Sequence, residues 1–462
     1  MNTHPARGMR DFLPEDVRRR QYVIDVIAGV YQRYGFEPLE TPAVENIETL
    51  MGKYGEEGDR LIFRILKRGE EGKSGEADLA LRYDLTVPLA RVVAQYRAQL
   101  PRFFKRYQIQ PVWRADRPQK GRFREFYQCD VDCLGSTSPI VEAELCAAVS
   151  DVLDRLGFKT FDIIINHRAL LTASLKQLGF VAEQHSDVIT LIDKVDKIGL
   201  TGLRTELRQK GFSETQVEGV CRNFLHDDIG PSLGADWLDF YARDLDLEGH
   251  PSITNLKEIF TLIRATSAEG RVKFEPCLAR GLSYYTGAIF EVKVEDLAGS
   301  LGGGGRYDNL VGMFSGREVP AAGFSLGLER ILVVMTERGM FPDAARLRPA
   351  DVMVTICNFN DGVDELELKA EALRLAAQLR SGGVSVEVFP DVTDLGKQIK
   401  YAGERGIPFA TVIGARERDA GRVGLRDLAS RQQEDLSVGE LVTYLQDKKL
   451  TADSPEPGAA RG

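Results

Sequence analysis

Two long strand-forming segments, joined by a short basic loop, constrain this fold more than any other sequence feature. The segments span residues 103–114 and 123–134, and the loop 115–122 is rich in turn formers. This arrangement predicts a hairpin and therefore an antiparallel sheet. Alternate residues of a strand face opposite sides. One face of the second strand should therefore carry Phe126, Gln128, Asp130 and Asp132, and the other Tyr127, Cys129, Val131 and Cys133. The first face either binds a polar ligand or is exposed to solvent.

The hairpin is locally basic although the chain is acidic overall. Its cations are Arg106, Arg114, Arg117, Lys120, Arg122 and Arg124. The planar guanidinium of arginine suits phosphate oxygens. The whole chain of 462 residues has 60 basic and 69 acidic residues, a formal net charge of −9. This balance argues against a protein that coats nucleic acid through bulk charge, but a local RNA-binding surface stays possible.

Several other classes of protein are disfavoured. The five histidines are scattered and no C-x-x-C or H-x-x-x-H spacing occurs, so a zinc site is not expected. The six cysteines are sparse and are interpreted as reduced thiols of a cytoplasmic protein. No apolar run reaches the roughly 18 residues of a membrane span, and no secretory signal is visible.

Hydrophobic periodicity and turn residues divide the remainder of the chain. Helices are expected at 14–35, 139–156 and 325–338, with a charged helical block over about 168–265 that resembles an insertion. An extended segment is expected at 36–45, where two prolines exclude a helix. Shorter strands are expected at 59–67, 77–83, 272–278 and 285–294.

A different pattern begins after a predicted linker at 341–349. Strands at 351–357, 384–389, 409–413 and 422–427 alternate with helices at 363–380, 394–405 and 437–448. This alternation predicts a separate α/β domain over 350–448, followed by a disordered tail at 449–462.

Three further segments carry chemistry or packing. The segment 278–291 contains Arg280 and the pair Tyr284 and Tyr285, which either bind a ligand or pack as an aromatic pair near a turn. Four glycines at 302–305 allow close approach to a ligand, or form a flexible turn. The segment 322–330 ends in Arg330, which on a helix is often a surface residue.

Taken together and in this order, the segments resemble the histidyl-tRNA synthetases, a family of class II aminoacyl-tRNA synthetases, over about residues 5–445. Residues 36–45, 103–132 and 322–332 resemble the three class II motifs, and 278–291 resembles the histidine-specific motif. The resemblance implies an α+β fold: an antiparallel sheet flanked by helices in a catalytic domain at 1–340, with the helical insertion, and a C-terminal α/β anticodon-binding domain at 350–448.

The family's reaction follows from the resemblance. Histidine and ATP give histidyl-adenylate, and the histidyl group then passes to the 3′ end of tRNA(His). Mg²⁺ is expected with ATP, without assigned protein ligands. A homodimer is expected through the segment around Pro42.

The resemblance also assigns roles to residues. The catalytic arginines would be Arg114, Arg280 and Arg330. The ATP site would comprise Arg114, Asp116, Arg122, Phe126 and Arg330. The histidine site would comprise Asp84, Leu85, Thr86, Arg114, Gln128, Asp132, Arg280, Tyr284 and Tyr285. Asp84 and Thr86 are expected to share one face of an extended segment.

A second function belongs to the same fold. A catalytically silent paralogue acts with ATP phosphoribosyltransferase in histidine biosynthesis; it usually lacks the anticodon-binding unit and has an eroded R-G-L-x-Y-Y segment. Here residues 350–448 are present and Arg280 to Tyr285 are nearly intact. The sequence therefore favours the ligase. It departs from many bacterial members at Asp116, Asp132 and Ser283, which leaves the shape of the histidine pocket open.

Overall fold

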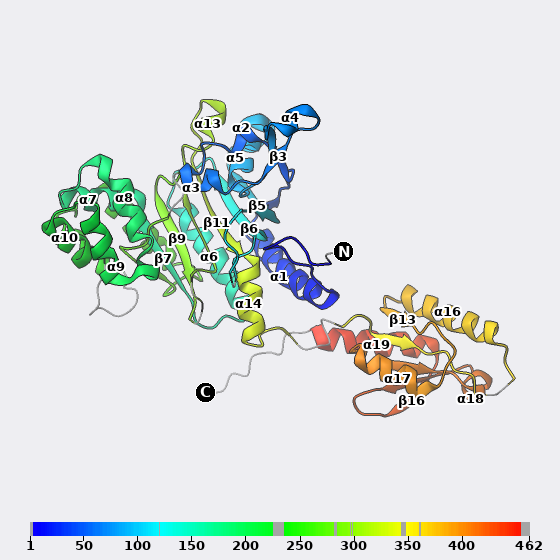
Figure 1. The fold of residues 1–462 in the computed structure, drawn as a ribbon. Coiled ribbons are helices and arrows are strands. Elements are labelled where there is room, and N and C mark those ends of the chain that lie inside the picture. Colours follow the sequence, from blue (N-terminus) through cyan, green and yellow to red (C-terminus); the bar gives the residue numbers. More distant parts are fainter. Residues whose placement is uncertain are drawn as a thin grey trace. The chain divides into compact units, whose positions relative to one another are not determined.

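The computed structural model describes residues 3–453, except for Lys120, 225–234, 281–283, 296, 298, 343–347 and 360–361. The chain divides into two compact units, residues 1–340 and 341–462 (Figure 1). Most of the predicted linker, Ser283, and the predicted tail from 454 onwards lie outside the described residues.

The first unit is built on an eight-stranded, mostly antiparallel sheet, as predicted. In spatial order its strands are β1 (Glu37–Pro38), β5 (Phe104–Trp113), β6 (Glu125–Leu134), β11 (Ala321–Gly327), β10 (Gly302–Arg306), β9 (Ala288–Lys293), β7 (Asp162–His167) and β8 (Val272–Phe274). Among the described strands of this sheet, only the outer pairs, β1 with β5 and β7 with β8, are parallel. The predicted hairpin is β5–β6, paired from Phe104 opposite Leu134 to Trp113 opposite Glu125.

The glycine cluster at 302–305 belongs to a central strand, β10, and does not form the flexible turn that the sequence left open. A Cβ atom on Gly304 would lie 2.0 Å from the carbonyl oxygen of Gly323, and one on Gly303 would lie 1.8 Å from Nη1 of Arg280. The glycines therefore allow close approach, as predicted, but the groups that approach are a neighbouring strand and the Arg280 side chain.

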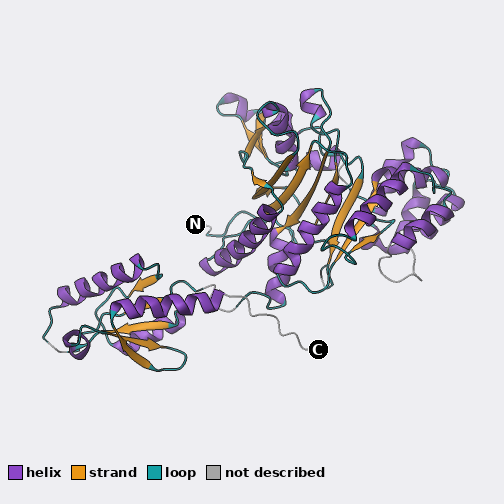
Figure 2. Ribbon diagram, turned by 180° about the vertical axis from the view of Figure 1, so that it is seen from behind, coloured by secondary structure: helices purple, strands orange, loops and turns teal. Residues whose placement is uncertain are grey.

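Helices cover one face of this sheet (Figure 2). They are α1 (Pro14–Arg33), α6 (Ile140–Arg155), α12 (Pro251–Ile263) and α14 (Leu328–Glu337). In α1, Val23, Ile27, Val30 and Tyr31 are buried, which is the spacing of one helical face. The helix predicted at 325–338 begins only at Leu328, because the three residues before it belong to β11.

The helical block is inserted between the paired strands β7 and β8. Its helices are α7 (Arg168–Gln177), α8 (Ala182–Ile192), α9 (Val195–Gln209), α10 (Glu214–Phe224), α11 (Ala235–Asp244) and α12. Helix α12 packs on α6. The chain thus leaves the sheet at the end of β7 and returns beside it at β8.

A small sheet completes the unit, with strands β2 (Val44–Asn46), β4 (Ala77–Leu81) and β3 (Arg64–Leu66). Nearby helices are α2 (Ile47–Leu50), α3 (Gly55–Arg60), α4 (Glu70–Lys73), α5 (Thr86–Tyr96) and α13 (Gly312–Ser315). The prediction of a strand over 59–67 is wrong in its first part. Helix α3 continues to Arg60, and strand β3 begins only at Arg64.

The second unit is an α/β domain. Its sheet has the order β13 (Val386–Val388), β12 (Val352–Val354), β14 (Phe409–Val412), β15 (Val423–Asp427) and β16 (Gln433–Leu436). Its helices are α16 (Glu365–Ser381), α17 (Leu395–Glu404), α18 (Ala415–Asp419) and α19 (Val438–Asp453). Elements β16 and α18 were not predicted, and α19 continues five residues beyond its predicted end at 448. In the described part of the chain, no helix has the length and apolarity needed to cross a membrane.

Candidate active site

A cavity of about 470 Å³ lies in the first unit. It is lined by β6, β10 and β11, by the loop after β5, and by the segment containing Arg280. It brings together nearly all the predicted site residues: Asp84, Thr86, Arg114, Asp116, Arg122, Phe126, Gln128, Asp132, Arg280, Tyr284, Tyr285 and Arg330. The exception is Leu85, whose side chain is fully buried elsewhere.

The predicted polar face of β6 points into this cavity. Gln128, Asp130 and Asp132 all line it, and each is less than a tenth exposed. This face is therefore not a solvated sheet surface. The amide of Gln128 donates to Oγ of Ser325 on β11 at 2.9 Å, while its Oε1 is buried and meets no hydrogen-bond donor of the described residues. A buried acceptor without a partner is costly, so it is a natural contact for a ligand donor.

Two buried carboxylates on β6 share one arginine of β5. Arg106 lies opposite Asp132 in the strand register, and its Nη2 is 3.0 Å from Oδ2 of Asp132 and 3.9 Å from Oδ2 of Asp130. The hydroxyl of Tyr307 donates to the other oxygen of Asp132. Burial raises the pKa of both carboxyls, that of Asp130 to about 7, against the opposing attraction of Arg106.

Asp84 is fixed from two sides. Its Oδ1 accepts hydrogen bonds from the hydroxyl of Tyr54 and from the backbone N–H of Val87, each at 3.0 Å. In the part of the chain that the structure describes, its Oδ2 is buried and has no hydrogen-bond partner. The expectation of an extended segment here is wrong, because Thr86 begins helix α5 and Asp84 accepts from the first turn. Both residues still line the cavity.

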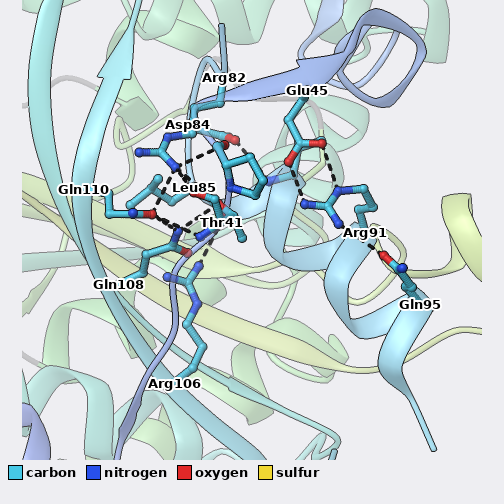
Figure 3. A network of polar contacts seen from close by, with 12 residues as sticks. Thr41, Glu45, Arg82, Asp84, Leu85, Arg91, Gln95, Arg106, Gln108 and Gln110 are labelled. Atoms are coloured by element: carbon cyan, nitrogen blue, oxygen red, sulfur yellow. Dashed lines mark hydrogen bonds and ion pairs between the residues drawn. The ribbon is translucent and has the colours of Figure 1, made fainter. Parts of the chain in front are cut away.

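The backbone beside Asp84 is held by a buried polar network around Arg82 (Figure 3). The Arg82 guanidinium donates to the carbonyl of Thr41 at 2.6 Å, to that of Pro111 at 2.9 Å, and to Oε1 of Gln110 at 3.0 Å. Arg106 joins this region through the carbonyl of Leu85 at 3.3 Å. The network ties the proline segment 36–45 to β5 and to the segment between β4 and α5 that carries Asp84.

Guanidinium groups gather elsewhere in the cavity. That of Arg114 lies 4.2 Å from the ring centroid of Tyr83 and 5.2 Å from that of Phe126, and its Nε donates to the Tyr83 carbonyl. Arg330 donates to the carbonyl of Ser300. Burial lowers the pKa of Arg330, and repulsion from Arg122, Arg114 and Arg280 lowers it further. Such mutual repulsion marks a place where an anion is stabilised.

Arg280 is positioned by strand β9. Its Nη1 donates to the carbonyl of Phe290 at 3.1 Å and lies 3.7 Å from the Glu291 carboxylate. Its Nε is buried and has no hydrogen-bond partner among the described residues. The ring of Tyr285 lies 5.6 Å from the guanidinium carbon. Tyr284 packs between Tyr285 and Tyr307, with ring centroids 4.9 and 6.0 Å apart.

The sequence did not identify several residues that line the cavity: Tyr54, Glu291, Tyr307, Ser325 and Glu329. Tyr307 lies two residues after the glycine cluster and Glu329 precedes Arg330, so proximity to a motif is a signal for both. Tyr54 contacts Asp84 from 30 positions away, and no local pattern marks it. In the described residues, no group of three or more histidine, cysteine or acidic side chains is placed to hold a metal ion.

Comparison with known proteins identifies the family. The family profile described as Histidyl-tRNA synthetase matches residues 8–331, and that described as Anticodon binding domain matches residues 351–448. The chain belongs to the histidyl-tRNA synthetase family. The C-terminal α/β unit is its anticodon-binding domain.

Similar proteins cover almost the whole chain. The Histidine--tRNA ligase of Gloeobacter violaceus is 42% identical, over 94% of this chain and 97% of the relative. That of Porphyromonas gingivalis is 40% identical, over 93% and 96%. The crystal structure of histidyl-tRNA synthetase from Nostoc sp. PCC 7120 has a TM-score of 0.81 at 30% identity and covers 97% of this chain and 100% of that one.

Proposed function

We propose that this chain is a histidine–tRNA ligase whose cavity first joins histidine to AMP and then transfers the histidyl group to tRNA(His). The observation that carries the proposal is that four arginines and three buried carboxylates line one cavity. Arg330 is repelled by Arg114, Arg122 and Arg280, and the carboxylates are those of Asp84, Asp130 and Asp132.

The arginines suit the phosphate chemistry. Attack of the histidine carboxylate on the α-phosphate of ATP releases pyrophosphate and develops negative charge on phosphate oxygens, which fixed cations stabilise. We assign the α-phosphate to Arg114 and Arg280, and the γ-phosphate to Arg330. Phe126 would stack on the adenine ring, while Asp116, held by Arg122 at 2.8 Å, would accept from the adenine amino group. Mg²⁺ is expected to enter with ATP.

The carboxylates suit histidine. We assign the free Oδ2 of Asp84 to the α-amino group, with Thr86 beside it. The imidazole would be recognised by Gln128, Asp132, Tyr284 and Tyr285. A pocket of hydrogen-bonding groups rejects amino acids that leave those groups unpaired, so the specificity can be high. Leu85 is expected to contribute through its backbone only, since its side chain does not line the cavity.

The remaining partners follow the family. The anticodon-binding domain would contact tRNA(His), and the active form is expected to be a cytoplasmic homodimer that uses the segment around Pro42. A likeness at TM-score 0.69 and 22% identity to a structure titled as an ATP phosphoribosyltransferase regulatory subunit/histidyl-tRNA synthetase shows the fold alone.

The test is ATP–pyrophosphate exchange by the purified protein with each of the twenty amino acids in turn. Exchange with histidine alone, followed by charging of tRNA(His), is the expected result. A folded protein that exchanges with no amino acid would contradict the proposal and favour the silent regulatory paralogue instead.

A further inference from the structure

A short segment before helix α1 lies against the loop that carries the cations of the β5–β6 hairpin. We call residues 7–12 the brace segment. The backbone N–H of Arg124 donates to the carbonyl of Gly8 at 2.8 Å. The Arg124 side chain donates from Nε to the carbonyl of Asp116 at 3.0 Å and from Nη1 to the carbonyl of Arg7 at 3.4 Å. Arg124 thus links the brace segment by hydrogen bonds to Asp116, which lines the cavity.

Gly8 is required at this contact for two reasons. Its φ of +86° is a conformation that residues with a side chain rarely adopt. A Cβ atom here would also lie 2.8 Å from Cγ of Arg124 and 2.9 Å from Cγ of Pro118. Both of these neighbours belong to the loop, so any side chain at position 8 would push the loop away from its position.

A stack of cations and rings makes a second contact. The Arg10 guanidinium lies 3.5 Å from the ring centroid of Phe123 and 4.7 Å from that of Phe12. Arg20 of α1 lies 4.6 Å from the centroid of Phe12 and 4.9 Å from that of Tyr127 on β6. The brace segment is therefore fixed at its end to α1, which packs on the sheet, and holds Phe123 of the loop from outside.

We propose that the brace segment positions this loop for ATP, with Gly8 and Arg10 as positioning residues. The inference rests on the proposed function. Neither residue lines the cavity, whereas Asp116, Arg122 and Phe123 do, so the brace segment acts through them. Without the brace, the loop would sample positions in which Asp116 and Arg122 no longer meet the nucleotide. Arg124 and Phe123, the loop residues that Gly8 and Arg10 contact, are not among the residues assigned to histidine.

The experiment compares Gly8→Ala and Arg10→Ala with wild type in histidine-dependent ATP–pyrophosphate exchange. Gly179→Ala is the matched control, because Gly179 has φ +83° and a Cβ atom there would meet nothing within 4 Å. We expect the KM for ATP to rise about tenfold in both test variants, while the KM for histidine stays within about twofold. Arg10→Lys keeps the charge but loses the flat stacking group, and should fall between wild type and Arg10→Ala.

The outcomes are distinguishable. Absence of exchange in wild type would refute the proposed function. If wild type is active, an unchanged KM for ATP in either folded test variant overturns the proposed role of the brace segment. An equal rise in the KM for ATP and the KM for histidine also overturns it. The same change in Gly179→Ala would also overturn it, because it would point to backbone strain alone. If Gly8→Ala does not fold, the Arg10 pair decides the question.

Discussion

The buried carboxylate of Asp130 allows a stability prediction whose sign and size follow from the structure. Asp130 is 2% exposed, and the nearest cation, Nη2 of Arg106, is 3.9 Å away and lies closer to Asp132. Burial therefore raises the pKa of Asp130 from an ordinary value of 3.8 to about 7. Asp130→Asn keeps the shape of the side chain and removes the charge.

The effect depends on pH in a defined direction. Below pH 4 the carboxyl is protonated in both the folded and the unfolded chain. Between pH 4 and 7, Asp130 ionises in the unfolded chain but not in the folded chain, so the free energy of unfolding of wild type falls progressively. Above pH 7 this fall is complete. Since one pKa unit is worth about 1.4 kcal/mol, the total is about 4 kcal/mol at most, and the shared arginine and coupling to Asp132 reduce it.

The assay is urea unfolding of wild type and Asp130→Asn at pH 5, 6, 7 and 8. We expect the variant's advantage in free energy of unfolding to grow by about 1–3 kcal/mol from pH 5 to pH 8. Asp132→Asn is the control, because it removes the negative charge closest to Arg106, and should gain less or lose stability. An advantage of Asp130→Asn that is the same at pH 5 and pH 8 would refute the reasoning.

Three other predictions concern activity. Arg280→Ala should abolish adenylate formation without unfolding the protein, and near wild-type pyrophosphate exchange would remove Arg280 from the catalytic group. Tyr54→Phe removes one of the hydrogen-bond donors to Asp84. It should raise the KM for histidine about tenfold or more and leave the KM for ATP nearly unchanged, and a rise in the KM for ATP alone would contradict this prediction. A chain ending at residue 340 should retain histidine activation but charge tRNA(His) poorly. Comparison of pyrophosphate exchange with aminoacylation of tRNA(His) tests this, and equal loss of both activities would assign the second unit a structural role.

The sequence predicted those parts of the fold whose pattern is local. The alternation of β6 placed Phe126, Gln128, Asp130 and Asp132 on one face, and the structure confirms that face in the cavity. Periodicity two is a property of the strand itself and needs no knowledge of its neighbours. The α/β pattern after residue 350 was recognisable for the same reason.

What the sequence could not predict depends on neighbours. Strand β10 has four glycines and almost no side-chain pattern, so only its pairing with β9 and β11 reveals it. Arg106 was recognised as a cation of the hairpin, but its role as the partner of Asp132 needs the register of β5 against β6. A register change of one residue would place Arg106 on the opposite face of the sheet.

In the proposed roles, the charges of the cavity would also orient the substrate. Free histidine carries a positive amino group and a negative carboxylate on the same carbon atom. The amino group would be attracted by the buried carboxylate of Asp84, and the carboxylate by arginines such as Arg330, which is itself repelled by Arg114, Arg122 and Arg280. The reverse orientation would place like charges together on both sides, which in a partly buried site costs far more than in water. In these roles, the cavity would therefore direct the carboxylate towards the region assigned to the α-phosphate. Orientation and side-chain selectivity are then separate tasks, and substitutions at Asp84 should impair the first for any amino acid, whereas substitutions at Gln128 should relax the second.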